Sequence, residues 1–298
     1  MTVQKALLVG INQYRYLRDL EGCRNDVAHW KHLLTQRCGA AENKVQYLVD
    51  EAATRQNLVR WWTWLCRVPE GSHAVFFFSG HGTQVTDRSG DERDRKDELY
   101  CLHESDPSDA RTYLYDDELW RLTAQFPTHS RLTVIVDSCH SGTALRAPGP
   151  PQPSAPAPVA PSDEVWSEAE GEPPFAGEVD SADPGPVLRY SPPPNPPRRE
   201  IRARTTAPEL RGQGDDRPQL NAFLAASQDD QEATEATIAG RRHGVFTYYL
   251  IRTLAAGGLN QPLGQVVEGV SRLIQSGGYP QVPNLLVRQP GDDRPLFA

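Results

Sequence analysis

Two continuous runs of apolar residues, HAVFFFS at 73–79 and RLTVIVD at 131–137, constrain the fold more than any other feature of the sequence. Both have the length of a strand and are rich in β-branched or aromatic residues, a pattern typical of strands covered on both faces. Such strands occur mainly in parallel sheets that helices cover on either side. The sequence therefore predicts an α/β fold around a mainly parallel sheet.

The segments around these two runs alternate strand and helix patterns. In the first 146 residues the expected strands are 5–11, 45–49 and 99–102, and the expected helices are 25–37, 55–68 and 116–125. The C-terminal part continues with strands at 220–227 and 284–287 and helices at 243–256 and 263–275. Strands that alternate with helices imply crossover connections and a parallel sheet.

The composition changes after residue 146. Of the 26 prolines in the chain, 18 lie between Pro148 and Pro218, among small and charged residues. Such a stretch has too few large apolar residues to fold by itself, so residues 147–218 are predicted to form a disordered or extended insert. The pieces on either side, 1–146 and 219–298, are expected to form one domain, because both continue the same alternation.

Charge and cysteine usage exclude some classes of partner and site. The formal net charge of -8 disfavours nucleic acid, and no apolar run approaches the length of a membrane helix. The apolar run near the start, ending at Ile11, suits a buried strand better than a signal peptide. The five cysteines are widely spaced and form no CxxC pair, so neither a disulfide framework nor a zinc site is expected. A reducing cytoplasm is the predicted location.

Two segments carry the candidate chemistry. FFFSGHGTQ at 76–84 and VIVDSCHSG at 134–142 each join an expected strand to a turn of small residues that presents one reactive side chain. Sites in parallel sheets lie at the carboxyl ends of strands, so His81 and Cys139 are expected at the same edge. There the imidazole can take the proton of the thiol and later return it to a leaving amine. The N–H groups of Gly82 and Cys139 are candidates for an oxyanion hole.

Each of these residues alone also has a structural interpretation. A cysteine after a strand is often a small buried hydrophobe, and a histidine in a glycine-rich turn often only supports that turn. His140 competes with His81 as the base. Adjacent residues in an extended segment point to opposite sides, however, which favours His81 as the partner of Cys139.

The joint occurrence of SGHG and DSCHSG resembles the metacaspases, relatives of the caspases among the cysteine peptidases. Outside the insert the resemblance extends to KALLVGIN, LEGCRNDV, SGDERDRKDE, YDDELW, LAASQDDQEATE and HGVFTYYL. It implies a caspase-like three-layer sandwich with a large-subunit-like region at 1–146, a linker at 147–218 and a small-subunit-like region at 219–298 that completes the same domain. It also implies an endopeptidase that cleaves after Arg or Lys and requires no cofactor for the chemistry.

The resemblance further implies an acidic S1 pocket, with matching positions at Cys23, Asp26, Ser79 and Asp137. Carboxylates beside the catalytic pair suit a guanidinium or ammonium group at the P1 position of a substrate and would repel an aspartate there. The alternatives are that Asp26 caps the helix that begins near it and that Asp137 only accepts hydrogen bonds from backbone N–H groups.

Many metacaspases need calcium as an activator, and the matching carboxylates here are Asp97, Asp116 and Asp117. Calcium takes about six to eight oxygen ligands, often from flexible loops, and the 87–98 loop is rich in such oxygens. Arg146 stands where the family often supplies a further aspartate, and a cation there would repel calcium. The alternative is a solvated loop of mixed charge next to a helix N-terminus.

The insert offers possible cleavage sites for a protease of this kind. Exposed, disordered chain is the preferred place for proteolysis, so autoprocessing is predicted between residues 189 and 211. The candidate P1 residues are Arg189, Arg199, Arg202 and Arg204. A passive tether, or a polyproline ligand for another module through PPPNPP at 192–197, is the alternative.

Two other functions compete with the Arg- or Lys-directed peptidase. One is a caspase-fold protease of different P1 preference, and the other is a catalytically silent scaffold or signalling module whose insert recruits partners. The pair of His81 and Cys139 favours an enzyme, because a scaffold needs neither residue. The expected partners are protein or peptide substrates with a basic P1 residue, and the analogy with metacaspases favours a monomer.

Overall fold

A computed structural model of the chain describes residues 3–86, 96–123, 125–127, 129–139, 185–194, 220–227, 231–287 and 294–297. Most of the proline-rich insert lies outside this part of the chain, as do His140, Arg146, Arg199, Arg202 and Arg204. The short stretch 185–194, however, is described, and it becomes central to the candidate site. In the described residues no helix is both long and apolar enough to cross a membrane.

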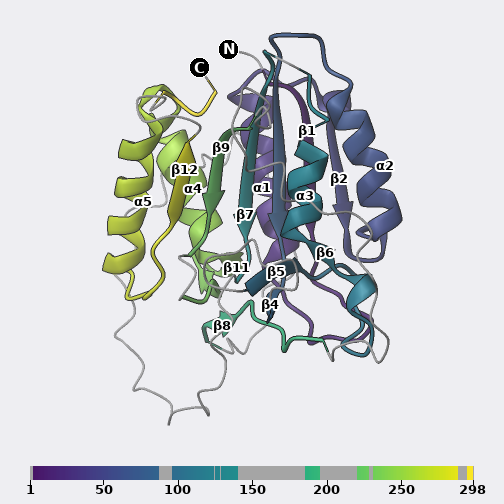
Figure 1. The fold of residues 1–298 in the computed structure, drawn as a ribbon. Helices are drawn as coiled ribbons and strands as arrows, with labels where there is room; N and C mark the ends of the chain where they lie inside the picture. The colour runs from purple at the N-terminus through teal and green to yellow at the C-terminus, as the bar shows by residue number, and fades with distance from the viewer. Residues whose placement is uncertain are drawn as a thin grey trace.

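A six-stranded sheet forms the centre of the molecule, with strand order β12-β9-β7-β3-β1-β2 (Figure 1). Its strands are β1 (Val3–Gly10), β2 (Val45–Val49), β3 (His73–Ser79), β7 (Arg131–Asp137), β9 (Leu220–Ala225) and β12 (Asn284–Val287). All neighbouring pairs are parallel except β12 with β9. The strands after the insert therefore extend the same sheet that the strands before it begin.

Helices cover both faces of this sheet, as the continuous apolar strands require. On one face lie α1 (Cys23–Gln36), α4 (Val245–Ala255) and α5 (Leu263–Ser276), whose apolar side chains pack with Leu8, Phe77 and Ile135. On the other face α2 (Arg55–Cys66) and α3 (Asp116–Thr123) pack with Leu7, Phe76 and Val134. The alternation of side chains along β3 thus supplies both cores, and the fold is an α/β sandwich of three layers.

Two small antiparallel sheets were not predicted from the sequence. One has the order β4-β5-β6, formed by Gly82–Thr86, Lys96–Tyr100 and Leu114–Tyr115, and the other has the order β11-β10-β8, formed by Arg241–Gly244, Thr234–Ile238 and Val187–Leu188. Short 3-10 helices occur at 42–44, 50–52, 110–112 and 258–260. In Figure 1, β4, β8 and β11 lie near the carboxyl end of β7, at one edge of the central sheet.

The large elements agree with the expected ones, with shifts at their ends. The strand expected at 99–102 is instead β5, at 96–100, and the helix expected from 243 begins at 245, because residues 241–244 pair as β11. α2 ends at Cys66 rather than at 68, and its N-terminus is capped by the Thr54 hydroxyl, which accepts from the Asn57 N–H at 3.2 Å.

Candidate active site

The candidate catalytic residues follow two neighbouring strands at one edge of the sheet. β3 and β7 pair in parallel with Ser79 opposite Asp137, so His81 and Cys139 each lie two residues beyond this last pair. The backbone between them is tightly packed, since a Cβ atom at Gly82 would overlap the Cys139 carbonyl oxygen. Only glycine fits at residue 82, and its absence of a side chain brings the two turns together.

The Cys139 thiol is buried and held by one backbone unit of the C-terminal part. Its Sγ accepts a hydrogen bond from the Ala233 N–H at 3.1 Å and lies 3.3 Å from the Ala233 carbonyl oxygen. Burial raises the pKa of the thiol above its usual range, and the Glu232 carboxylate adds to this. The thiol is therefore neutral at neutral pH and needs a base to become a nucleophile.

The backbone of Arg18 fixes the protonation of the His81 ring. Its Nε2 atom lies 2.8 Å from the Arg18 carbonyl oxygen, and since a carbonyl only accepts, Nε2 carries the proton. In the described residues Nδ1 has no hydrogen-bond partner, which leaves it as the basic nitrogen. Burial lowers the pKa of His81, while contacts with the backbone of Arg18 and Arg189 oppose this, so the ring is a neutral proton acceptor.

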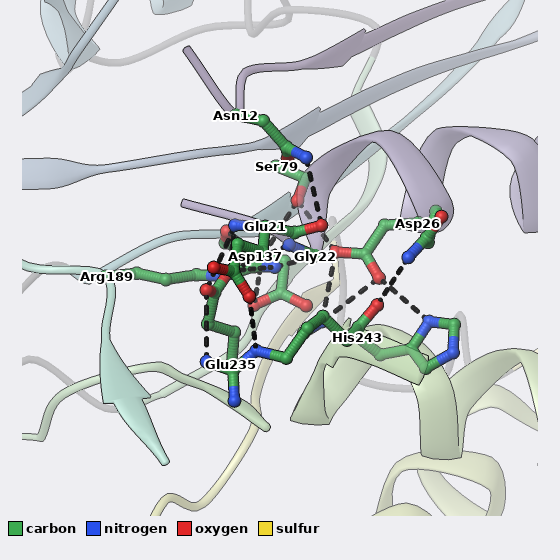
Figure 2. A network of polar contacts seen from close by, with 12 residues as sticks. Asn12, Glu21, Gly22, Asp26, Ser79, Asp137, Arg189, Glu235 and His243 are labelled. Carbon is green, nitrogen blue, oxygen red and sulfur yellow. Dashed lines mark hydrogen bonds and ion pairs between the residues drawn. The ribbon is translucent and has the colours of Figure 1, made fainter. Parts of the chain in front are cut away.

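A buried arginine from the insert occupies the space beside these two residues. Arg189 is completely buried, although it belongs to the proline-rich insert. Its Nη2 lies 2.8 Å from Asp26 Oδ2 and 3.7 Å from Glu235 Oε2, and its Nη1 lies 3.2 Å from Asp137 Oδ1. Figure 2 shows the guanidinium surrounded by these carboxylates. We call the side chains of Asp26, Ser79, Asp137 and Glu235 the acidic pocket.

The acidic pocket brings together the residues expected to bind a basic side chain. Ser79 accepts from Arg189 Nη1 at 2.8 Å and donates to Asp26 Oδ2 at 2.8 Å. Cys23 is buried at the start of α1, close enough for the charge of Arg189 to affect its pKa, although burial dominates and raises that pKa. Three of the four positions suggested by the resemblance, Asp26, Ser79 and Asp137, therefore contact one guanidinium.

The two alternative interpretations of the carboxylates have different outcomes. Asp26 does not cap α1, whose N-cap is Gly22 without a side-chain hydrogen bond; its carboxylate instead accepts from the Gly244 N–H at 3.0 Å. Asp137 does accept from a backbone N–H, that of Thr247, at 3.0 Å, and also from the Thr247 hydroxyl. Asp137 also contacts Arg189, so the same carboxylate accepts a structural hydrogen bond and pairs with the cation.

The charges in the acidic pocket depend on one another. Burial alone would lower the pKa of the Arg189 guanidinium, but the surrounding negative charges, Asp137 foremost, raise it well above its usual range. Burial alone would raise the pKa of Asp26, but Arg189 and the neighbouring His243 hold it below its usual range. For Asp137, burial wins and the pKa is raised. The cation in this pocket thus favours the ionised form of Asp26 and Asp137, but it outweighs burial only at Asp26.

The comparison with known proteins identifies the family. Residues 4–148 match the model of the metacaspase peptidase C14 domain. Metacaspase-1 of Pyricularia oryzae is 30% identical over 309 residues, which cover 97% of this chain and 72% of that protein. The chain belongs to the metacaspases. Membership in this family makes it a hydrolase, a cysteine-type endopeptidase.

Other relatives match about half of the chain. Metacaspase-1 of Schizosaccharomyces pombe is 38% identical over 154 residues, which cover 49% of this chain and 35% of that protein. The metacaspase described here thus spans about a third of that relative in the matched region.

Solved structures support the fold of this metacaspase. A protein of Geobacter sulfurreducens aligns with a TM-score of 0.64 at 21% identity, covering 98% of this chain and 97% of that one. Caspase-1 of Spodoptera frugiperda aligns with a TM-score of 0.53 at 9% identity, covering 96% of this chain and 86% of that one. The prediction of a caspase-like α/β sandwich is confirmed.

Sequence reasoning missed one carboxylate and its support in the metacaspase site. Glu235 on β10 was part of a matching motif but had no predicted role. It accepts from the N–H groups of Glu21 and Gly22 and lies 3.2 Å from Arg242 Nη2. Gly244 was also missed; a Cβ atom there would overlap Asp137 Oδ2 and crowd Arg189 Nη1. What points to Glu235 is its burial in the short strand β10, which is visible only in the structure.

The structure describes the side chains of only some of the expected calcium ligands. The side chains of Asp97 and Asp117 lie outside the described residues, and Asp116 begins α3. The described residues contain no group of three or more His, Cys, Asp or Glu side chains that could hold a metal ion. β5 does pair with β6, with Leu99 opposite Tyr115, which brings the start of α3 close to the strand that contains Asp97.

Proposed function

We propose that this metacaspase cleaves proteins after arginine or lysine, with Cys139 as the nucleophile and His81 as the general base and acid. The observation that carries the proposal is the environment of Arg189, a fully buried guanidinium with a carboxylate on each of its terminal nitrogens. Its own backbone carbonyl accepts from the Gly82 N–H at 2.9 Å, between the turns that present His81 and Cys139. A basic side chain in the acidic pocket thus brings its carbonyl to the catalytic pair.

The chemistry follows from the positions of these groups. His81 Nδ1 takes the proton of the Cys139 thiol, and the thiolate attacks the carbonyl carbon of the P1 residue. The Gly82 N–H stabilises the negative charge on the carbonyl oxygen. As the C–N bond breaks, His81 returns the proton to the departing amine and leaves a thioester on Cys139. Water, deprotonated by His81, then releases the carboxylic acid and restores the thiol.

One contact supports the oxyanion hole predicted from the sequence. The Gly82 N–H donates to the Arg189 carbonyl oxygen, whereas in the described residues the Cys139 N–H makes no hydrogen bond to that oxygen. The Cys139 N–H therefore stays a prediction. Hydrogen bonds of this kind often become shorter only when the tetrahedral intermediate forms.

The geometry favours arginine over lysine at P1. Nη1 contacts Ser79 and Asp137, while Nη2 contacts Asp26, so the two terminal nitrogens have separate acceptors. A guanidinium fits such a divided site as a fork, whereas an ammonium group acts as a single point charge. An aspartate would meet only like charges. We expect cleavage after Arg to be faster than after Lys, and cleavage after Asp to be undetectable.

Fluorogenic tripeptides that differ only at P1 test this function. Wild-type protein should hydrolyse the Arg peptide, then the Lys peptide at a lower rate, and not the Asp peptide. Cys139→Ala and His81→Ala should be inactive with all three. Preference for Asp would favour a caspase-fold protease of different P1 specificity. If correctly folded protein hydrolysed none of the three peptides, the result would favour the scaffold.

Self-processing in the insert and activation by calcium belong to the same proposal. The candidate P1 residues for self-processing are Arg189, Arg199, Arg202 and Arg204, of which only Arg189 is described by the structure. Calcium would be held by Asp97, Asp116 and Asp117, and its chemistry would be to order the 87–98 loop through carboxylate oxygens. Peptide hydrolysis with added calcium and with a chelator tests this; equal rates would exclude activation.

A further inference from the structure

The peptide group that joins Ala233 to Thr234 faces the nucleophile and the buried arginine at once. Its carbonyl oxygen lies 3.3 Å from Cys139 Sγ and accepts from the Arg189 N–H at 3.0 Å. With Arg189 in the acidic pocket, its N–H marks the place that the P1 N–H of a substrate would take. The orientation of this one peptide group therefore decides whether a P1 residue finds an acceptor beside the thiol.

The other end of the same peptide group is held by Gln281. The Thr234 N–H donates to Gln281 Oε1 at 3.0 Å, and Gln281 Nε2 donates to the Ala226 carbonyl oxygen at 3.0 Å. Because an N–H only donates and a carbonyl only accepts, these two bonds define which end of the side-chain amide faces each group. The peptide group cannot rotate without breaking its bond to Gln281.

Gln281 also connects this peptide group to the strand that presents the nucleophile. Ala226 directly follows β9, and its N–H donates to the Val136 carbonyl oxygen of β7 at 2.9 Å. β7 leads into the turn that contains Cys139. A path of hydrogen bonds thus runs from β7 through the backbone of Ala226 and the side chain of Gln281 to Thr234. The thiol and the acceptor for the P1 N–H are placed relative to the same strand.

The surroundings of Gln281 suit a residue that must keep one position. It is completely buried in the loop between α5 and β12, and Pro280 and Pro283 stand close to it in the chain. Proline fixes φ, so this loop has few other conformations. The neighbouring Val282 N–H donates to Gln231 Oε1 at 2.7 Å, which ties the loop a second time to the segment before β10.

We propose that Gln281 is a positioning residue of this metacaspase, one that holds the Ala233 carbonyl oxygen where it accepts the P1 N–H of a substrate. The inference rests on the proposed function, which makes Cys139 the nucleophile and a basic residue P1. Gln281 acts through the peptide group and not by contact with the substrate. Its bond to the Thr234 N–H also polarises that peptide group, which makes the carbonyl oxygen a stronger acceptor.

Two substrates that differ in one group test this role. One is an Arg tripeptide with a fluorogenic leaving group, and the other is its depsipeptide, in which an ester oxygen replaces the P1 N–H. The ester oxygen cannot donate to the Ala233 carbonyl oxygen. The ratio of kcat/KM for the two substrates therefore measures what the enzyme gains from this hydrogen bond. Competition from the chain's own Arg189 affects both substrates equally and cancels in the ratio.

Three variants of the full chain are compared with the wild type. Gln281→Leu removes both bonds of the side chain, and Gln281→Asn keeps an amide that is one methylene too short to join the two groups. Gln231→Leu is the matched control, because its bond connects the same two segments but ends at the Val282 N–H. We expect a ratio of about tenfold in the wild type and in Gln231→Leu, and below about threefold in the two Gln281 variants.

The expected change has a direction that a purely structural role does not share. In the Gln281 variants kcat/KM should fall for the tripeptide, while the depsipeptide, which never made the hydrogen bond, should be hydrolysed at nearly the wild-type rate. A residue that only stabilises the loop would change both substrates alike and leave the ratio at its wild-type value. Thermal unfolding shows which variants are folded, and Gln281→Asn carries the test if Gln281→Leu is not.

Other outcomes would overturn the inference. An unchanged ratio in the folded Gln281 variants would leave Gln281 with a structural role alone. An equal fall of the ratio in Gln231→Leu would assign the effect to the whole loop. A wild-type ratio near one would show that the P1 N–H is not recognised, while the proposed function would stand. If folded wild type hydrolysed neither substrate, the proposed function and this inference would fail together.

Discussion

The two ends of the parallel strands use polar residues in opposite ways. At the carboxyl end of β3, Ser79 and the other side chains of the acidic pocket contact the arginine of the insert. At the amino end of the same strand, His73 Nε2 lies 2.8 Å from the Thr133 hydroxyl of the neighbouring β7. Lys5 on β1 donates to the Trp64 and Arg67 carbonyl oxygens, at 2.7 and 2.5 Å.

This difference teaches how to separate functional from structural groups in the fold. At the amino end, His73 Nε2 and the Lys5 ammonium group contact the protein's own backbone and side chains. The side chains of the acidic pocket at the carboxyl end converge on Arg189, a residue from a proline-rich segment that the sheet does not need for its own pairing. Substitutions at the carboxyl end should therefore change activity more than stability, and substitutions at the amino end should do the reverse.

The largest effect is expected at the catalytic pair. Cys139→Ala and His81→Ala should each lower kcat/KM for an Arg peptide by at least about 10⁴-fold, because residues that act as one unit lose most of the rate together. Their melting temperatures should stay close to that of the wild type. His73→Gln, assayed at pH 8, is the control at the other end of β3 and should retain activity. An equal loss in His73→Gln would break the contrast between the two ends.

The acidic pocket should show a graded response. Asp26→Asn should lower kcat/KM for Arg peptides by about 100-fold, since it removes one charge from a buried, hydrogen-bonded pair. Glu235→Gln should cost about tenfold, because its oxygen lies 3.7 Å from the guanidinium rather than 2.8 Å. Both are best measured in an Arg189→Gln background, so that the insert does not compete. A larger loss in Glu235→Gln would reverse the assigned order.

At the amino end, acid should destabilise the protein through His73. Burial lowers the pKa of His73 to about 3, and Arg131 contributes in the same direction. Below pH 6.5 the unfolded chain binds a proton that the folded chain does not, so stability is lost as pH falls from about 6.5 toward 3. Between pH 8 and pH 5 this amounts to about 2 kcal/mol of unfolding free energy.

Urea unfolding at the two pH values measures this loss. His73→Gln should remove about that much of the acid sensitivity. The matched control is His129→Asn, because His129 is exposed and asparagine tolerates its positive φ. The same sensitivity in His73→Gln as in the wild type would show that another group is responsible.

The smallest expected effect concerns Lys5. Its ammonium group binds carbonyl oxygens at the C-terminal end of α2 and lies 4.6 Å from the centroid of the Trp64 ring. Lys5→Met should lower the unfolding free energy by about 1 kcal/mol and leave peptide hydrolysis unchanged. Unfolding in urea checks the first part. A clear loss of activity would mean that the amino end of β1 influences the site.

The parts of the fold that could be predicted are those with a strong apolar signal. β3 and β7 are continuous apolar runs, and the register that places His81 near Cys139 follows from their being parallel neighbours. β8, β10 and β11 are short, β10 and β11 are mostly polar, and the three strands pair with one another rather than with the central sheet. Propensity does not predict such strands, because tertiary contacts decide their conformation.

The site divides in the same way. Cys139, His81, Asp26 and Asp137 lie on or directly after elements that the sequence pattern predicts. Arg189 could not be chosen among the arginines of the insert, because sequence distance does not tell which of them reaches the acidic pocket. Glu235 was missed for a related reason: its strand, β10, becomes a wall of the pocket only through pairing with β8 and β11.

Gly82 binds the extended chain beside it through its backbone atoms alone. Its N–H donates to the Arg189 carbonyl oxygen, and its own carbonyl oxygen accepts from the Ser191 N–H, two residues further on. A protein whose second residue after the arginine is proline has no hydrogen to donate there. A substrate with this proline would keep the hydrogen bond from the Gly82 N–H but lose the one to the Gly82 carbonyl oxygen. We therefore expect the choice of substrate to depend in part on this backbone hydrogen.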